Sequence, residues 1–340
     1  MKVNGDLCHD LLKERVKHRL AFSKNVEYAT WKEQLKEKFF ELIGIEKVRE
    51  NVCPLNFEIE SEEQKDGYKQ IRFTIESEIG SIVPVYVLIP DTRKEKYPVA
   101  IVLQGHSSGF HNSIGAPKNE TENDYALGRG KFAVQAVQRG YIAVAIEQRG
   151  MGERRPTKNI RGDAQMCAYE ALTALAYGRT ILAERMWDVS RVIDALGNFS
   201  QCDLDKIFIT GNSGGGTMSF YAACLDERIK LSVPSCAFCS YKTSILDIFH
   251  CACNYIPHAI EWFEMEDLSA LIAPRKLVAI NGRKDSIFPI EGVRKSFETV
   301  EEIFATEGCL ENCRLVETDR AHWWCEEIVW NAVEDALRNI

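Results

Sequence analysis

Short apolar runs separated by segments of helical length constrain the fold of this chain most strongly. Each run is too short for an ordinary helix and too uniformly apolar for a strand that has one face in water. The runs are residues 99–103, 142–146, 207–210, 231–233 and 277–280. Helices are expected at about 128–137, 164–177, 181–196, 215–225, 290–304 and 324–337. This pattern is typical of a parallel sheet that helices cover on both faces.

The chain before these runs has a different pattern. Residues 7–43 carry apolar side chains at helical spacing, and Gly44 follows as a helix stop. We therefore expect residues 1–50 to form a helical extension packed on the core. Alternating segments that predict antiparallel strands follow at 57–61, 68–76 and 82–89.

We assign residues 51–340 to one α/β domain. A chain of 340 residues with 45% hydrophobic residues can bury a large core. The segment 237–265 is rich in Cys, Phe, Tyr and Trp and precedes Pro274. It is predicted to be a small cap inserted over the carboxyl edge of the sheet.

Charge and hydropathy exclude several partners. The net charge is −8, so a phosphate-binding surface would oppose the field of the whole protein, and nucleic acid is not an expected partner. The N-terminus lacks the apolar stretch of a signal peptide, and no segment is long enough to span a membrane. The sequence thus predicts a cytoplasmic protein with no membrane partner.

The 12 cysteines are expected to be reduced thiols in such a compartment. The densest group contains thiol and imidazole ligands suited to zinc, at Cys236, Cys239, His250, Cys251 and Cys253. The spacing Cys251-Ala-Cys253 is not that of a usual zinc knuckle, and the flanking residues are apolar. We therefore expect packing roles for these cysteines, no metal and no cofactor.

A serine in a glycine-rich turn is the strongest chemical signal. The strand at 206–210 runs into Gly211-Asn212-Ser213-Gly214-Gly215, and a helical segment follows. A serine at the tip of a sharp strand-to-helix turn needs very small neighbours two residues away on both sides, which Gly211 and Gly215 provide. The alternatives are a turn that only packs a helix against a strand and a turn that binds phosphate. We predict that Ser213 is a nucleophile.

A serine hydroxyl needs a base, and a base needs an orienting group. Of the seven histidines, His322 lies after a short strand and before the last predicted helix. Asp285 follows the run at 277–280, so the chain order is serine, acid, histidine. A loop histidine and a capping aspartate are the alternatives for these two, and Glu317 and Asp319 are fallback acids.

Two backbone N–H groups are predicted to hold the oxyanion. One belongs to Gly214, at the start of the helix, and the other to His106, which follows the run at 99–103. The imidazole of His106 is alternatively part of the acyl pocket. Arg149 either braces this loop through a carboxylate or binds substrate. The predicted substrate-binding residues are Gly105, Arg149, Tyr255 and Trp323.

These motifs together resemble those of the α/β-hydrolase superfamily, in its acetyl xylan esterase-like and dienelactone hydrolase-like branches. The matching features, spread over residues 80–340, are Gln104-Gly105-His106, Arg149-Gly150, Gly211-Asn212-Ser213-Gly214-Gly215, Asp285 with Pro289, and His322. The resemblance implies an α/β-hydrolase fold, hydrolysis of carboxylic esters, often deacetylation of sugars, and no cofactor. Gln104 stands where the family commonly has histidine, and Gly214 where glutamine often follows the serine.

The expected function is therefore that of a serine esterase acting on small acylated molecules. A serine peptidase or amidase of the same fold is the first alternative, because the same three groups cleave amides. A hydrolase-like binding protein without turnover is the second. The sequence leaves a homo-oligomer open.

Overall fold

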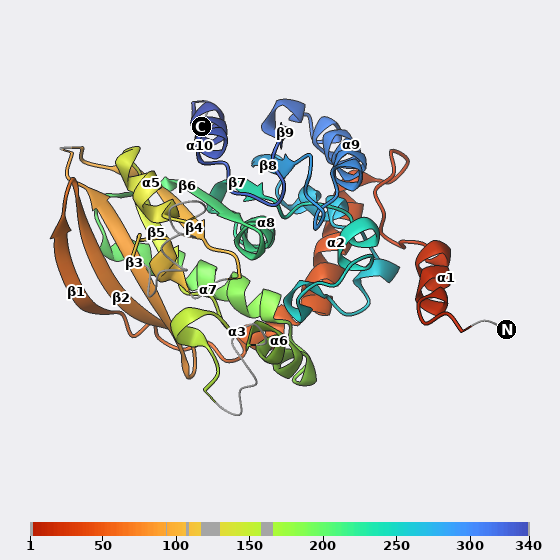
Figure 1. The fold of residues 1–340 in the computed structure, drawn as a ribbon, viewed down its shortest axis with the longest axis horizontal. Helices are drawn as coiled ribbons and strands as arrows, with labels where there is room; N and C mark the ends of the chain where they lie inside the picture. The colour runs from red at the N-terminus through yellow and green to blue at the C-terminus, as the bar shows by residue number, and fades with distance from the viewer. Residues whose placement is uncertain (1–2, 93, 107–108, 117–129, 158–165, 339–340) are drawn as a thin grey trace.

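One mixed sheet forms the centre of the molecule (Figure 1). The computed structural model describes residues 3–92, 94–106, 109–116, 130–157 and 166–338. Within them, nine strands pair in the order β1-β2-β3-β5-β4-β6-β7-β8-β9. They are β1 (Glu58–Lys65), β2 (Tyr68–Glu78), β3 (Ser81–Pro90), β4 (Tyr97–Leu103), β5 (Ile142–Ile146), β6 (Cys202–Asn212), β7 (Ile229–Ser235), β8 (Lys276–Gly282) and β9 (Cys313–Thr318). From β1 to β5 neighbouring strands are antiparallel, and from β5 to β9 they are parallel.

Helices cover both faces of the parallel part, as the apolar runs predict. Along β4, Val99, Ile101 and Leu103 pack into one apolar cluster, whereas Ala100 and Val102 pack into a second cluster on the other face. The first face is covered by α7 (Ile181–Ala195), α8 (Gly214–Leu225) and α9 (Ile290–Thr306), and the second by α5 (Phe132–Gln138) and α10 (Glu326–Leu337). In Figure 1, α10 and α8 lie on opposite sides of β6 and β7. The predicted α/β-hydrolase architecture is confirmed.

The helices predicted at 128–137 and 324–337 begin later in the structure than the sequence predicts. The helix expected at 128–137 begins at Phe132, and residues 128–129 lie outside the described residues. The helix expected from 324 begins at Glu326. Trp324 precedes this helix, and its indole is buried in the second cluster, where its Nε1 donates to Oε1 of Gln135 at 3.0 Å. Residues 164–165, where another helix is predicted to begin, also lie outside the described residues, and that helix is seen as α6 (Met166–Ala176).

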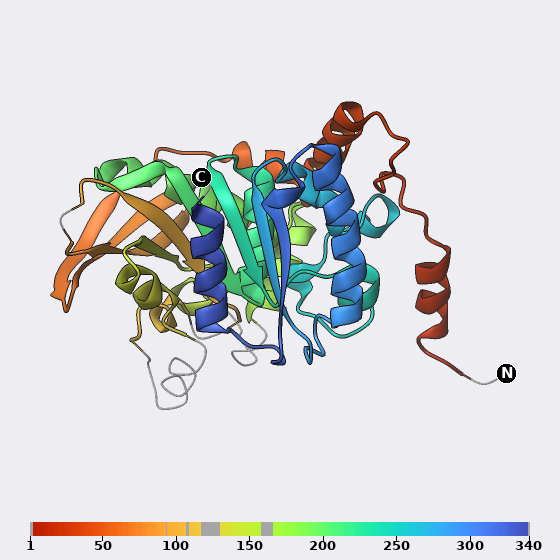
Figure 2. The ribbon, with the colours of Figure 1, turned by 90° about the horizontal axis from the view of Figure 1, so that it is seen from above.

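The N-terminal extension is only partly packed on the core. Helix α2 (Tyr28–Ile43) and helix α3 (Ile45–Arg49) bury the apolar side chains Trp31, Leu35, Phe39, Ile43, Ile45 and Val48. Between them Gly44 has φ +71°, and a Cβ there would lie 2.4 Å from the carbonyl oxygen of Gly178. By contrast, α1 (Leu7–Arg15) buries no residue and stands apart from the body in Figures 1 and 2.

The segment predicted as a cap lies between β7 and β8 and folds into short turns rather than long helices. These turns are Tyr241–Ile245, Ala252–Asn254 and Ala259–Glu261. Phe238 and Phe263 anchor it in the core, and the carboxylate of Glu264 accepts the backbone N–H groups of Tyr241 and Lys242. Among the helices of the described residues, none combines the length and apolar content that crossing a bilayer requires.

Replacing Phe39 tests whether α2 is part of the core. Its ring is fully buried and contacts the rings of Tyr221 and Phe263. We expect Phe39→Ala to lower the free energy of unfolding by about 3 kcal/mol or more in urea titrations, because it leaves a cavity. The neighbouring Phe40 is only half-buried, so Phe40→Ala is the matched control with a smaller loss. Equal losses would contradict the docking of α2.

Candidate active site

Ser213 lies at a sharp turn between β6 and α8. Its backbone has φ +56° and ψ −124°, a region that residues other than glycine rarely adopt. The turn is held because the N–H of Ser213 donates to the carbonyl of Ser235 at 2.9 Å. A Cβ on Gly211 or on Gly215 would lie 2.3 or 2.0 Å from the carbonyl oxygen of Leu103. Glycine at these two positions lets β6 and α8 approach β4 this closely, which agrees with the very small residues that the sequence predicts to be needed there.

His322 and Asp285 meet beyond the carboxyl ends of β9 and β8. Nδ1 of His322 lies 2.8 Å from Oδ2 of Asp285. The other oxygen, Oδ1, accepts the backbone N–H groups of Ile287 and Phe288 at 2.8 and 3.2 Å. Asp285 is 4% exposed, so this carboxylate is fixed in orientation inside the protein. Because Asp285 is bonded to Nδ1 of His322, the second ring nitrogen of His322, Nε2, takes no part in this contact.

One cavity is lined by the predicted nucleophile, the predicted base and the predicted oxyanion residues. It has a volume of about 320 Å³, and both Ser213 and His322 line it. The other lining residues are Gly105, His106, Asn212, Gly214, Thr217, Phe249, His250, Cys251, Asn254, Ile287 and Phe288. The structure therefore brings the predicted nucleophile, base and oxyanion residues to a single site.

His250 of the cap and Phe288, which follows β8, form a wall of the cavity that the sequence does not predict in detail. The ring of Phe288 stacks on His322 with centroids 5.9 Å apart, and His250 packs edge-on against Phe288. Nε2 of His250 lies 3.1 Å from the hydroxyl of Ser244. Burial lowers the pKa of His250, and the nearby His322 lowers it further. His250 is thus a neutral, hydrogen-bonded wall of the cavity.

The predicted oxyanion loop approaches the serine turn closely. A Cβ on Gly105 would lie 2.9 Å from the carbonyl oxygen of Asn212 and 3.1 Å from Cβ of Ser213. The backbone nitrogen of His106 is 3.7 Å from the position that a Cβ on Gly214 would occupy. The amides of residues 106 and 214, the predicted oxyanion donors, are therefore close neighbours beside Ser213.

Glu147 holds this loop, whereas the sequence-based prediction gave that role to Arg149 acting through a carboxylate. Its Oε1 accepts the side-chain amide of Gln104 at 3.2 Å and the backbone N–H of Phe110 at 3.1 Å. Its Oε2 accepts the N–H of Glu153 at 3.2 Å. Glu147 is fully buried, and this burial raises its pKa to about 7. A single buried carboxyl group thus ties the segment after β4 to the segment after β5.

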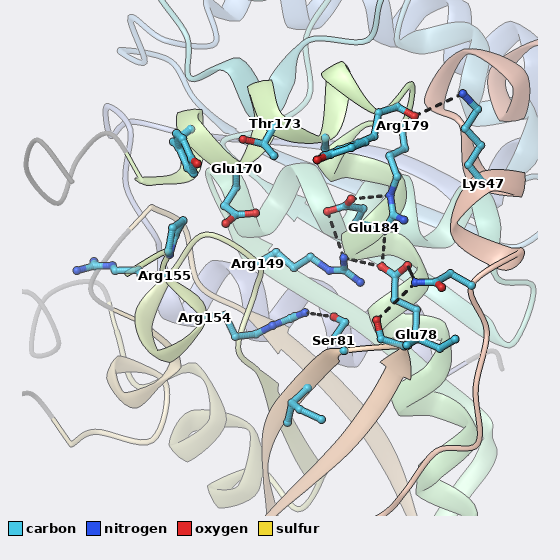
Figure 3. A pocket seen from close by; sticks show the side chains of 18 of the residues that line it. Lys47, Glu78, Ser81, Arg149, Arg154, Arg155, Glu170, Thr173, Arg179 and Glu184 are labelled. Atoms are coloured by element: carbon cyan, nitrogen blue, oxygen red, sulfur yellow. Dashed lines mark hydrogen bonds and ion pairs between the residues drawn. The ribbon is translucent and has the colours of Figure 1, made fainter. Parts of the chain in front are cut away.

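The structure does not bring Arg149 into the cavity with the triad. It lines a larger pocket of about 990 Å³, shown in Figure 3. There its guanidinium pairs with Glu78 at 2.6 Å, Glu184 at 3.2 Å and Asp188 at 2.9 Å. Arg154 joins the same network through Asp188. These ion pairs give Arg149 a structural setting between β2 and α7.

The two predicted aromatic residues also lie outside the lining of the triad cavity. The hydroxyl of Tyr255 donates to the carbonyl of Ile245 at 3.0 Å, and its ring faces a pocket shared with α1. Trp323 is 40% exposed, and its carbonyl oxygen accepts a hydrogen bond from the thiol of Cys236. Of the four predicted substrate-binding residues, Gly105 alone lines this cavity.

The cysteines are all free thiols, and the structure regroups those considered as zinc ligands. Cys236 lies beside Asp285 and His322. Cys251 and Cys253 instead lie with two residues from elsewhere in the chain, His106 and Cys167.

Comparisons with known proteins agree with the fold. A sequence model of the Abhydrolase family matches residues 4–307. "Putative hydrolase YtaP" of Bacillus subtilis (strain 168) is 29% identical over 244 residues, which cover 71% of this chain and 78% of that protein.

Two solved structures are similar in shape. A "putative acetyl xylan esterase" from Bacteroides fragilis NCTC 9343 aligns with a TM-score of 0.76 and 18% identity, over 94% of this chain and 83% of that chain. A glucuronoyl esterase from Solibacter usitatus aligns with a TM-score of 0.66 and 14% identity, over 96% of this chain and 99% of that chain. At these identities the likeness shows a shared fold.

The pH dependence of stability tests the buried state of Glu147. The pKa of its carboxyl group is about 7 in the folded protein and about 4.5 when unperturbed, so the folded state retains a proton that the unfolded chain releases. The stability that the Glu147 carboxyl group contributes is fully present below pH 4.5, the pKa in the unfolded chain, and is lost as the pH rises through about 7, the pKa in the folded protein. Between about pH 5 and pH 8, wild type is expected to lose about 2 kcal/mol of unfolding free energy relative to Glu147→Gln. Urea titrations of both proteins measure this difference, and parallel pH profiles would contradict it.

Proposed function

Because the chain belongs to the Abhydrolase family, we propose that it is a serine esterase that cleaves small acylated molecules, with acetylated sugars as the first substrate class. The observation that carries the proposal is the 2.8 Å contact between Nδ1 of His322 and Oδ2 of Asp285, at a cavity that Ser213 also lines. A serine on a strained turn, an oriented imidazole and two amides at one cavity are the parts that acyl transfer needs.

The first half of the reaction forms an acyl-enzyme. Nε2 of His322 takes the proton of the Ser213 hydroxyl while its oxygen attacks the ester carbonyl carbon. The carbonyl oxygen becomes an anion, and the N–H groups of Gly214 and His106 donate hydrogen bonds to it. The N-terminus of α8 adds its positive dipole end at the same place. Asp285 keeps the Nδ1 proton of His322 in place and stabilises the imidazolium.

The second half releases the acid. The imidazolium of His322 gives its proton to the leaving alkoxide, so the alcohol departs and the acyl group stays on Ser213. A water molecule then loses a proton to His322 and attacks the acyl carbon. The serine oxygen leaves with that proton, and the carboxylic acid is freed.

The size and lining of the cavity support a small polar substrate. Its volume of about 320 Å³ is at the lower end of the usual range for small-molecule sites. Thr217, His250 and Asn254 place polar groups beside the aromatic ring of Phe288, an arrangement suited to sugar hydroxyls next to an acyl group. The two proteins of similar structure, a "putative acetyl xylan esterase" and a glucuronoyl esterase, support carbohydrate esters as substrates.

The proposed place of action is the cytoplasm. All 12 cysteines are free thiols, and three of them lie together beside His106 without a disulfide. Neighbouring thiols stay reduced more readily in a reducing compartment than in an oxidising one.

Kinetics on acetylated xylose and p-nitrophenyl acetate test the proposal. We expect Ser213→Ala to abolish turnover, and Asp285→Asn to lower kcat by about 10³- to 10⁴-fold because His322 loses its fixed tautomer. Ser61→Ala, on the exposed edge strand β1, is the matched serine control and keeps full activity. Faster cleavage of aminoacyl amides than of the esters, or turnover that survives Ser213→Ala, would refute the esterase mechanism.

A further inference from the structure

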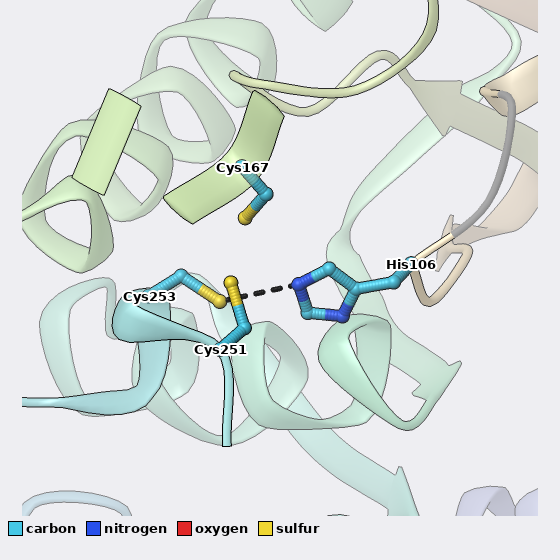
Figure 4. Close-up of side chains that lie close together, drawn as sticks. All are labelled: His106, Cys167, Cys251 and Cys253. Carbon is cyan, nitrogen blue, oxygen red and sulfur yellow. Dashed lines mark hydrogen bonds between the residues drawn. The ribbon is translucent and has the colours of Figure 1, made fainter. Parts of the chain in front are cut away.

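Three thiols and one imidazole converge beside the active-site cavity. They are Cys167 on α6, Cys251 and Cys253 in the cap, and His106 in the oxyanion loop, and Figure 4 shows their side chains directed toward one another. The three sulfur atoms and one ring nitrogen all lie within 4.8 Å of one another. Nε2 of His106 is 3.3 Å from the sulfur of Cys253.

We propose that His106, Cys167, Cys251 and Cys253 bind one zinc ion. Tetrahedral zinc with bonds of about 2.3 Å to sulfur and 2.0 Å to nitrogen places its ligand atoms about 3.5–3.8 Å apart. In the cluster these atoms lie within 4.8 Å of one another, so side-chain rotations that bring them about 1 Å closer would close the site around the ion. Three cysteines with one histidine form one of the common ligand sets of structural zinc.

A buried arginine next to the cluster supports a zinc site with a net negative charge. Arg185 is 3% exposed, and its Nη2 donates to the sulfur of Cys167 at 3.0 Å. Its other hydrogen bonds go to the carbonyl of Arg149, and no carboxylate of the described residues forms an ion pair with it. A guanidinium cannot lose its proton, so its burial requires an anionic neighbour. Three thiolates, a neutral imidazole and a divalent ion leave one net negative charge, which Arg185 balances.

The surroundings are those of a structural site rather than a catalytic one. Cys167 and Cys253 are buried in a small apolar cluster with Met151, Ala171 and Ile181. Four protein ligands complete the zinc shell and leave no position for substrate. Binding releases the three thiol protons to the solvent, and no oxidation or reduction takes place.

The ion would connect the oxyanion loop to α6 and to the cap. Coordination through Nε2 keeps the remaining proton of His106 on Nδ1. The imidazole lies close to the start of α8, because a Cβ on Gly214 would be 3.1 Å from this Nδ1. The backbone N–H of His106 remains available as an oxyanion donor because zinc uses only the side chain. His106 is therefore a positioning residue for its own loop.

Metal analysis of the full chain tests the site independently of any esterase activity. The protein is made in zinc-supplemented medium and purified without a metal-affinity tag. Inductively coupled plasma mass spectrometry is then expected to find about one zinc ion per chain. Cys251→Ala should lose the metal, whereas Cys251→His, which keeps a ligand at a partly exposed position, should retain it. Cys224→Ala, a buried thiol outside the cluster, is the control that keeps full zinc.

Cobalt spectroscopy of the wild-type chain tests the site without relying on variants, which could fail to fold. Removal of zinc and addition of Co²⁺ should produce the visible bands of a tetrahedral cobalt centre and a thiolate charge-transfer band. Wild-type protein that holds neither zinc nor cobalt, that gives an octahedral cobalt spectrum, or that contains a disulfide between two of these cysteines would overturn the proposal.

Discussion

The contact between His322 and Asp285 is the interaction on which the rest of the site depends. The two residues are 37 positions apart and meet because β8 and β9 are parallel neighbours. Their carboxyl ends deliver both loops to one edge of the sheet. Two backbone N–H groups orient the carboxylate, and Phe288, from the same turn, stacks on the imidazole. The strained turn at Ser213 presents the serine to the same cavity.

Much of the fold and the core of the site follow from the sequence for local reasons. Strands buried on both faces must be apolar throughout, so runs such as 99–103 and 142–146 identify the parallel sheet. The glycines around Ser213 are required by close backbone approach, and this requirement is visible in the sequence. Chain order then directs attention to Asp285 and His322, which the structure brings together.

The rest depends on tertiary contacts that spacing does not encode. Arg149 follows a core strand as a binding residue would, yet three carboxylates from β2 and α7 surround it. In the sequence Glu147 has no feature that separates it from other charged residues, but in the structure it is buried and its hydrogen bonds connect two loops. The proposed zinc ligands come from three distant segments, so Cys251 and Cys253 alone do not form a recognisable motif.

These contacts place the same loop under two constraints, Glu147 on one side and the cluster of thiols at His106 on the other. Electrostatic stabilisation of an oxyanion requires donors that are already in position before the charge forms. A loop of small residues such as Gly105 would not hold its amides rigidly alone. The hydrogen bond of Phe110 to Glu147, directly after β5, and the contact of His106 with Cys253 in the cap restrict the movement of this loop.

The most direct measurement of the central claim is peptide mapping after reaction with a fluorophosphonate. Such reagents phosphonylate a serine only where a base and an oxyanion site activate it. The account predicts a single adduct on Ser213 that forms rapidly in wild type and at least about 10³-fold more slowly in His322→Ala. An adduct on another residue, no adduct, or equal labelling rates in the two proteins would contradict it.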